Sequence, residues 1–151
     1  MTLDELTTFG EALGEALGEA LGEALGEALG EAAMRAVPCV VTLAGDLGAG
    51  KTTLTRAIGS GFGVVEAVTS PTFALVHEFA TPDHRRFVHL DLFRINGPHE
   101  LANIGWESVL GEPALVVIEW PDRAGALLPA DALAITLAHV ADDETRRRVK
   151  W

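Results

Sequence analysis

The sequence predicts an α/β domain with a mixed central sheet flanked by helices and an extended helix at the amino terminus. Three observations indicate this class. A repetitive segment of helix-forming residues opens the chain, three short apolar runs (37–44, 87–93 and 114–120) are separated by helical and turn segments, and a glycine-rich turn follows the first run. Alternation of strands and helices is typical of a largely parallel sheet.

The amino-terminal segment 10–32 consists of five copies of the tetrapeptide GEAL and the first three residues of a sixth. Each interior glycine costs ~1 kcal/mol relative to alanine, so tertiary packing must hold this helix. A step of four residues turns ~40° past a full turn, so the repeat leucines cannot all face one core. A helix from about Thr8 to Ala36 would measure roughly 43 Å against a domain diameter of roughly 38 Å, so we expect one end to protrude, bend or fray.

The repeat has several interpretations. Its spacing matches G-x-x-x-G, which pairs apolar helices in membranes, but a glutamate follows every glycine here and argues against that role. The glycine and alanine face could pair helices of two chains, or the repeat is an expanded low-complexity helix of which only part packs. Because four added residues keep a helix nearly in phase, we favour an insertion that the fold tolerates. We assign 1–36 to this helix, within one domain, and 37–151 to the remainder.

The charge and the composition of the chain argue against direct nucleic-acid binding and against a membrane span. The formal charge is -11, and the only cluster of arginines, 146–148, is short and terminal, so the chain is not expected to bind DNA, or to contact tRNA except through basic partners. No apolar run approaches the ~18 residues of a membrane span. The single cysteine, Cys39, cannot form an internal disulfide. We therefore expect a cytoplasmic protein.

The first apolar run leads into "GDLGAGKTT", which matches the P-loop pattern G-x-x-x-x-G-K-[ST]. In such a loop the backbone N–H groups surround a phosphate chain, Lys51 reaches the β- and γ-phosphates, and the Thr52 hydroxyl can bind Mg²⁺. A helix expected over 51–61 adds its dipole to anion binding. The sequence therefore predicts a single P-loop NTPase domain, whose cofactor-binding residues are Gly45, Asp46, Leu47, Gly48, Ala49, Gly50, Lys51, Thr52 and Thr53.

Two further apolar runs end in carboxylates, Asp91 in "FVHLDLF" and Glu119 in "ALVVIEW". Either could lie near a metal, and either could instead cap a turn. Between the P-loop and Asp91, Ser70 and Thr72 offer hydroxyls beside a proline, as a phosphate-sensing loop would, or form a turn into a strand. Trp120 follows Glu119, where a nucleotide or a partner could contact it.

The segment 73–93 alternates around the turn "TPDH" and predicts a β-hairpin, which makes the sheet mixed. The five histidines, His89 among them, show no zinc spacing and are expected to be surface or packing residues.

Taken in order, "GDLGAGKTT", "SPTF", "HLDLFR", "ELANIGWES", "VVIEWPDR" and "LPADAL" resemble the bacterial TsaE (YjeE) family over residues 40 to about 138. The resemblance implies a P-loop α/β fold, binding and slow hydrolysis of ATP with Mg²⁺, and action with the TsaB and TsaD proteins in tRNA threonylcarbamoyladenosine biosynthesis. It also implies roles for particular residues: Lys51, Asp91 and Glu119 in catalysis, Thr52 and Glu119 as metal ligands, and Ser70, Thr72 and Trp120 at positions that respond to nucleotide or contact partners.

The chain departs from the family pattern in places. Phe93 stands where the family usually has tyrosine, so a hydroxyl is missing there while the ring remains. No arginine finger is evident, although Arg94 or Arg123 could serve within the chain. Upstream of the repeat only Thr7 and Thr8 are weak candidates for nucleotide contacts.

Three other functions remain open at this stage. A small-molecule kinase would need a lid and an acceptor pocket, for which 151 residues leave little room. A GTPase would need a guanine-reading N-K-x-D motif, which the chain lacks. A nucleotide-gated scaffold would bind ATP without needing to hydrolyse it.

Overall fold

A computed structural model describes residues 1–30, 39–68 and 75–151, and for residues 20–30 it describes the backbone alone. The helices and strands, in chain order, are α1 (Leu3–Gly30), β1 (Cys39–Gly45), α2 (Lys51–Phe62), β2 (Val76–Ala80), β3 (Arg86–Asp91), α3 (Trp106–Gly111), β4 (Leu115–Glu119), β5 (Leu133–Val140) and β6 (Asp143–Lys150). Three short 3₁₀ helices are also present, at Pro98–Ile104, Pro121–Arg123 and Gly125–Leu127.

The strands form one sheet in the order β2-β3-β4-β1-β5-β6. The four central strands are parallel, whereas β2 and β6 pair antiparallel with β3 and β5. The sheet is therefore mixed, and the hairpin predicted over 73–93 is confirmed as β2 and β3. The parallel strands are apolar along their length because both of their faces are covered.

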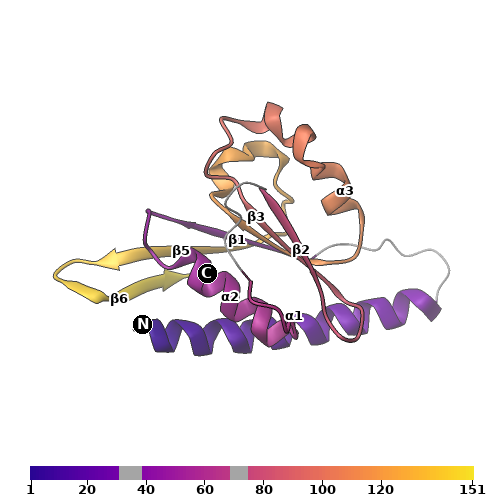
Figure 1. The fold of residues 1–151 in the computed structure, drawn as a ribbon, viewed down its shortest axis with the longest axis horizontal. Helices are drawn as coiled ribbons and strands as arrows, with labels where there is room; N and C mark the ends of the chain where they lie inside the picture. The colour runs from indigo at the N-terminus through magenta and orange to yellow at the C-terminus, as the bar shows by residue number, and fades with distance from the viewer. Residues whose placement is uncertain (31–38, 69–74) are drawn as a thin grey trace.

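Helices cover the two faces of the sheet (Figure 1). On one face α2 lies against the strands and α1 lies outside α2, while α3 and the 3₁₀ helices cover the other face. Alternate residues of each strand enter the two cores: Leu115 and Val117 of β4 point toward the α2 side, and Val116 and Ile118 point toward the α3 side. By the same alternation Glu119, which ends β4, lies on the α2 side.

The amino terminus of α1 is fixed in three ways. Thr2 and Glu5 form a capping box, in which each side chain accepts the backbone N–H of the other residue. Thr2 forms an isolated antiparallel β-bridge with Arg146 of β6, and the Met1 ammonium donates to the Arg147 carbonyl at 2.7 Å. The helix thus begins five residues before the expected Thr8.

The other end of α1 reaches past the strands and α2 (Figure 1). Its 28 residues correspond to about 42 Å of helix. The end expected at Ala36 lies outside the described residues. In the described parts of the chain no helix is both long enough and apolar enough to cross a membrane.

Glycines, and not the repeat leucines, form the closest contact between α1 and α2. Gly10, Gly14 and Gly18 are buried, whereas Leu13 and Leu17 are partly buried beside them. Residues four apart form the ridge that helices use when their i±4 rows interdigitate. Over these three copies the glycine face considered for pairing two chains is occupied by α2 of the same chain.

The approach of the two helices leaves no room for a side chain. A Cβ added at Gly14 would lie 2.0 Å from the Ile58 carbonyl oxygen, and one added at Gly61 would lie 1.9 Å from the Glu11 carbonyl oxygen. Both obstacles are backbone atoms, which cannot rotate away. The low helix propensity of the repeat is therefore offset by backbone contact that only glycine allows.

We expect Gly14→Ala and Gly61→Ala each to lower the free energy of unfolding by roughly 2–3 kcal/mol, because α1 must move away from α2. Gly111→Ala is the matched control, since a Cβ there meets nothing within 4 Å. It should leave stability unchanged or raise it by less than about 1 kcal/mol. Urea denaturation of the three variants is the measurement. Equal stabilities would contradict the close approach.

Removal of 14–21, two whole copies, should leave the contacts with α2 intact, because the following copies supply the same residues at the same positions. We expect a chain that folds cooperatively, with the helical signal reduced by about eight residues in circular dichroism. Removal of 14–19 is the control, since it disrupts the four-residue phase that places glycine against α2. If both deletions unfold the domain, the repeat is not a tolerated insertion.

Candidate nucleotide site

The loop between β1 and α2 lies at the carboxyl end of the parallel strands. β1 has β4 on one side and β5 on the other, and α2 starts directly after the loop, at Lys51. In open α/β sheets ligands bind at this edge, and the amino terminus of the helix favours an anion there. The strand, loop and helix expected around "GDLGAGKTT" therefore occur in the predicted order.

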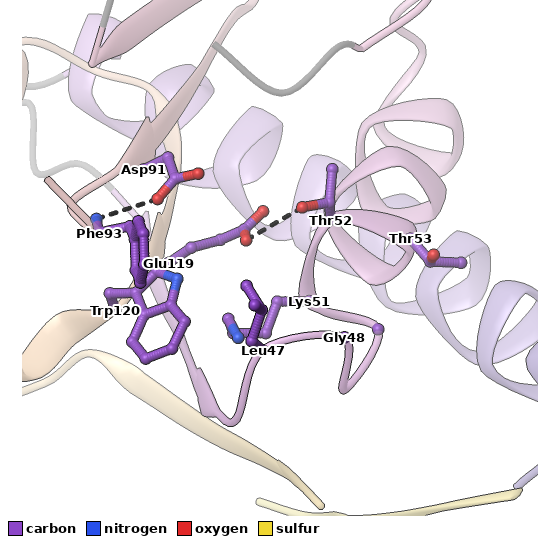
Figure 2. A pocket seen from close by; sticks show the side chains of 10 residues that line it. Leu47, Gly48, Lys51, Thr52, Thr53, Asp91, Phe93, Glu119 and Trp120 are labelled. Atoms are coloured by element: carbon purple, nitrogen blue, oxygen red, sulfur yellow. Dashed lines mark hydrogen bonds between the residues drawn. The ribbon is translucent and has the colours of Figure 1, made fainter. Parts of the chain in front are cut away.

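A cleft of about 310 Å³ opens at this edge (Figure 2). It brings together the P-loop, the first turn of α2 and the ends of β3 and β4. Its lining residues are Leu47, Gly48, Gly50, Lys51, Thr52, Thr53, Asp91, Phe93, Glu119 and Trp120. Nine of the expected site residues thus meet in one cleft, although they are up to 73 positions apart in the sequence.

Glycines give the loop its shape. Gly48 and Gly50 adopt φ values of 75° and 101°, in the left-handed region that other residues rarely enter. Gly45 ends β1 so close to β5 that an added Cβ would lie 2.2 Å from the Leu137 carbonyl oxygen. Ala49 is fully buried beneath the loop and therefore supports it without lining the cleft.

Lys51 is 5% exposed and lies under the loop. Its ammonium donates to the carbonyl oxygens of Gly45 and Asp46, at 2.7 and 2.8 Å. Burial lowers the pKa of this ammonium, and the nearby carboxylates of Glu119, Asp91 and Asp46 act in the opposite direction. Gly45 and Asp46 thus serve the site through their backbone, because neither lines the cleft.

Trp120 closes one side of the cleft. Its φ of 59° is unusual for a residue with a side chain, and this turn aims the indole back over Lys51, whose Nζ lies 4.0 Å from the ring centroid. Phe93 packs against the same indole, with ring centroids 5.0 Å apart. The ring that replaces the family's tyrosine therefore has a packing partner.

Glu119 and Thr52 meet inside the cleft. The Thr52 hydroxyl donates to Glu119 Oε2 at 3.1 Å, as Figure 2 shows. Asp91 lies beside Glu119 in the register of β3 and β4, and its Oδ1 accepts the backbone N–H of Phe93 at 3.0 Å. An alcohol and carboxylate oxygens are hard donors, so this pair fits Mg²⁺ better than a soft metal. Within the described residues no cluster of three His, Cys, Asp or Glu side chains suits a metal.

Two buried residues that the sequence did not predict for this site contact the Glu119 carboxylate. The Thr55 hydroxyl donates to Glu119 Oε1 at 3.0 Å, and His89 Nε2 lies 2.9 Å from the same oxygen. A usable signal was present for His89. It precedes Asp91 by two residues on one strand, so both side chains occupy the same face of the sheet.

Some candidates lie elsewhere. Ser70 and Thr72 fall outside the described residues. Arg94 is exposed and Arg123 partly buried, and neither lines the cleft. The hydroxyls of Thr7 and Thr8 bond to carbonyls of their own helix, those of Leu3 and Asp4.

Comparison with known proteins gives a consistent result. A family model described as "Threonylcarbamoyl adenosine biosynthesis protein TsaE" matches residues 7–149. Curated relatives named tRNA threonylcarbamoyladenosine biosynthesis protein TsaE include one from Nostoc sp., 42% identical over 88 residues, which are 56% of this chain and 53% of the relative. One from Haemophilus influenzae is 36% identical over 103 residues, covering 68% and 65%. One from Streptomyces coelicolor is 38% identical over 107 residues, covering 69% and 71%.

The match with the first two of these relatives therefore spans between half and two thirds of their length. Among solved structures, the crystal structure of Bacillus subtilis YdiB aligns with 99% of this chain and 78% of its own, with a TM-score of 0.62 and 22% identity. At that identity the likeness concerns the fold, and it supports the α/β class predicted from the sequence.

We expect ATP to change the fluorescence of Trp120, because a phosphate that attracts the Lys51 ammonium removes a cation from the face of the indole. A variant carrying Trp106→Phe and Trp151→Phe isolates this signal. A variant carrying Trp120→Phe and Trp151→Phe retains the buried Trp106 and is the control, with no change expected. An equal response in both variants would mean that ATP does not act through the cleft.

Proposed function

The chain belongs to the TsaE family, and on that premise we propose that it binds ATP with Mg²⁺, hydrolyses it slowly, and supports tRNA threonylcarbamoyladenosine biosynthesis together with TsaB and TsaD. The observation that carries the proposal is the contact of Thr52 with Glu119 at the start of α2, in the same cleft as Lys51. A hydroxyl, a carboxylate and an ammonium at a helix amino terminus are the groups that a nucleoside triphosphate and its divalent cation require.

Each residue has a defined part in this proposal. The loop amides and the Lys51 ammonium would neutralise the β- and γ-phosphates. Thr52 and Glu119 would hold Mg²⁺, which when bound supplies positive charge to the phosphate oxygens. Asp91, next to Glu119 at the strand ends, is suited to orient the attacking water.

Slow hydrolysis is expected because the described lining of the cleft contains no arginine. An arginine supplied to a P-loop site accelerates phosphoryl transfer by about 10³–10⁵-fold, and partner proteins commonly supply it. A requirement for TsaB and TsaD is thus consistent with a cleft that is incomplete by itself.

The charge of the chain supports an indirect relation to tRNA. At -11 the surface would repel a phosphate backbone, so the partners would provide the contacts with tRNA. The proposed role places the protein in the cytoplasm.

The test is ATP hydrolysis by the purified chain, alone and with TsaB and TsaD, measured together with threonylcarbamoyl transfer to tRNA. We expect the partners to raise the rate and Glu119→Gln to lower the stimulated rate by about 100-fold. Lys51→Ala should weaken ATP binding about 10- to 100-fold, because a hydrogen bond to a charged group contributes ~1.5–3 kcal/mol.

Glu107→Gln on α3 and Lys150→Ala on β6 are the matched controls, since neither side chain lines the cleft, and neither should change the rate. ATP-dependent support of tRNA modification that survives Glu119→Gln would favour a nucleotide-gated scaffold. A chain whose rate the partners leave unchanged, and which phosphorylates a small acceptor, would instead be a kinase.

A further inference from the structure

His89 is a fully buried histidine beside the carboxylate of the cleft. It lies on β3, with 0% of its surface exposed, and its Nε2 is 2.9 Å from Glu119 Oε1. β3 and β4 are adjacent parallel strands in which His89 pairs with Val117 and Asp91 pairs with Glu119. The imidazole therefore reaches Glu119 diagonally from the neighbouring strand.

The two oxygens of Glu119 have different surroundings. Oε1 accepts the Thr55 hydroxyl at 3.0 Å and faces His89 Nε2, both of which lie in the core. Oε2 accepts the Thr52 hydroxyl, which lines the cleft. Figure 2 shows Glu119 extending from its strand toward Thr52. Oε1 is thus hydrogen-bonded by residues of the core, and Oε2 points into the cleft.

The position of the proton on His89 follows from its neighbours. A carboxylate only accepts hydrogen bonds, so Nε2 must carry the proton that bonds Glu119. Nδ1 is buried and has no hydrogen-bond partner among the described residues. A proton there would be an unsatisfied buried donor, which costs more than an unsatisfied acceptor lone pair. The hydrogen bonds around the ring therefore assign the imidazole hydrogen to Nε2.

We infer that His89, with Thr55, is a positioning residue that fixes the rotation of the Glu119 carboxylate, so that Oε2 alone is presented to Thr52 and to a divalent cation. The metal side of this inference rests on the proposed function. Without the two donors to Oε1 the carboxylate would be free to rotate about its terminal bond, and a metal would bind only the fraction of molecules with the correct orientation. Neither residue would touch nucleotide, because neither lines the cleft.

The first test is nitrogen NMR of the histidine side chains in the full-length chain without nucleotide. We expect one imidazole with its proton on Nε2 and slow exchange of that proton, and we expect Glu119→Ala to accelerate the exchange. The exposed His99 provides the reference for a ring in contact with solvent. A His89 ring protonated at Nδ1, or unaffected by Glu119→Ala, would overturn the positioning contact.

The second test is the Mg²⁺ concentration at which ADP binding is half-maximally strengthened. Residues that orient a metal ligand typically contribute 10- to 100-fold to metal affinity, so His89→Leu should raise this concentration about 10-fold or more while binding of ADP without metal stays unchanged. His89→Gln should restore much of the affinity, because its amide donates from nearly the position of Nε2.

Thr55→Val keeps the side-chain volume and removes one donor from the same oxygen, so it carries the test if His89→Leu does not fold. It too should raise the Mg²⁺ requirement, with ADP binding in the absence of metal as its internal control. If folded His89→Leu or Thr55→Val needs no more Mg²⁺ than the unaltered chain, the inference fails and the proposed function stands. If the unaltered chain binds neither ATP nor ADP, the proposed function fails, and the metal part of the inference fails with it.

Discussion

The arrangement of the cleft depends on how the buried carboxylate of Glu119 is satisfied. The residue is 2% exposed, and removing a carboxylate from water costs several kcal/mol unless neighbouring donors compensate. Its donors come from two other elements, Thr52 and Thr55 on α2 and His89 on β3. A shift of α2 or of β3 relative to β4 would break at least one of these bonds, so the carboxylate fixes the three elements relative to one another.

Helix α2 connects the Glu119 carboxylate to helix α1. Its first two turns carry the polar residues of the cleft, while Ile58 and Gly61 contact α1. The helix also ends at a defined point, because Gly63 adopts a φ of 102° and Arg85 donates to the Phe62 carbonyl oxygen at 2.8 Å. The packing of glycines against α1 and the cap at the carboxyl-terminal end of α2 therefore help to fix the position of the polar residues in its first turns.

Local chemistry explains which features the sequence could predict. The loop around Lys51, the hairpin and the carboxylates at Asp91 and Glu119 follow from glycine spacing and from strand alternation, and the structure contains all of them. The contact of Glu119 with His89 depends on the order of the strands, which local patterns do not determine. Helix α1 starts earlier than the repeat predicts, because the capping box of Thr2 and Glu5 lies upstream of the repeat. The contacts of Ser70 and Thr72 stay predictions.

The identical copies in α1 also make its docking ambiguous. If the helix were displaced by one tetrapeptide, glycines would again face α2, and the two positions would differ little in packing energy along the repeat. What separates them lies upstream, where Leu6 is fully buried, Phe9 contacts Trp151 with ring centroids 5.3 Å apart, and Thr2 bridges Arg146. The two positions are therefore nearly equivalent for the repeat alone, and the upstream contacts favour the native one. The contacts of Thr2, Leu6 and Phe9 thus select the native register of the helix, and they do not depend on how many copies follow.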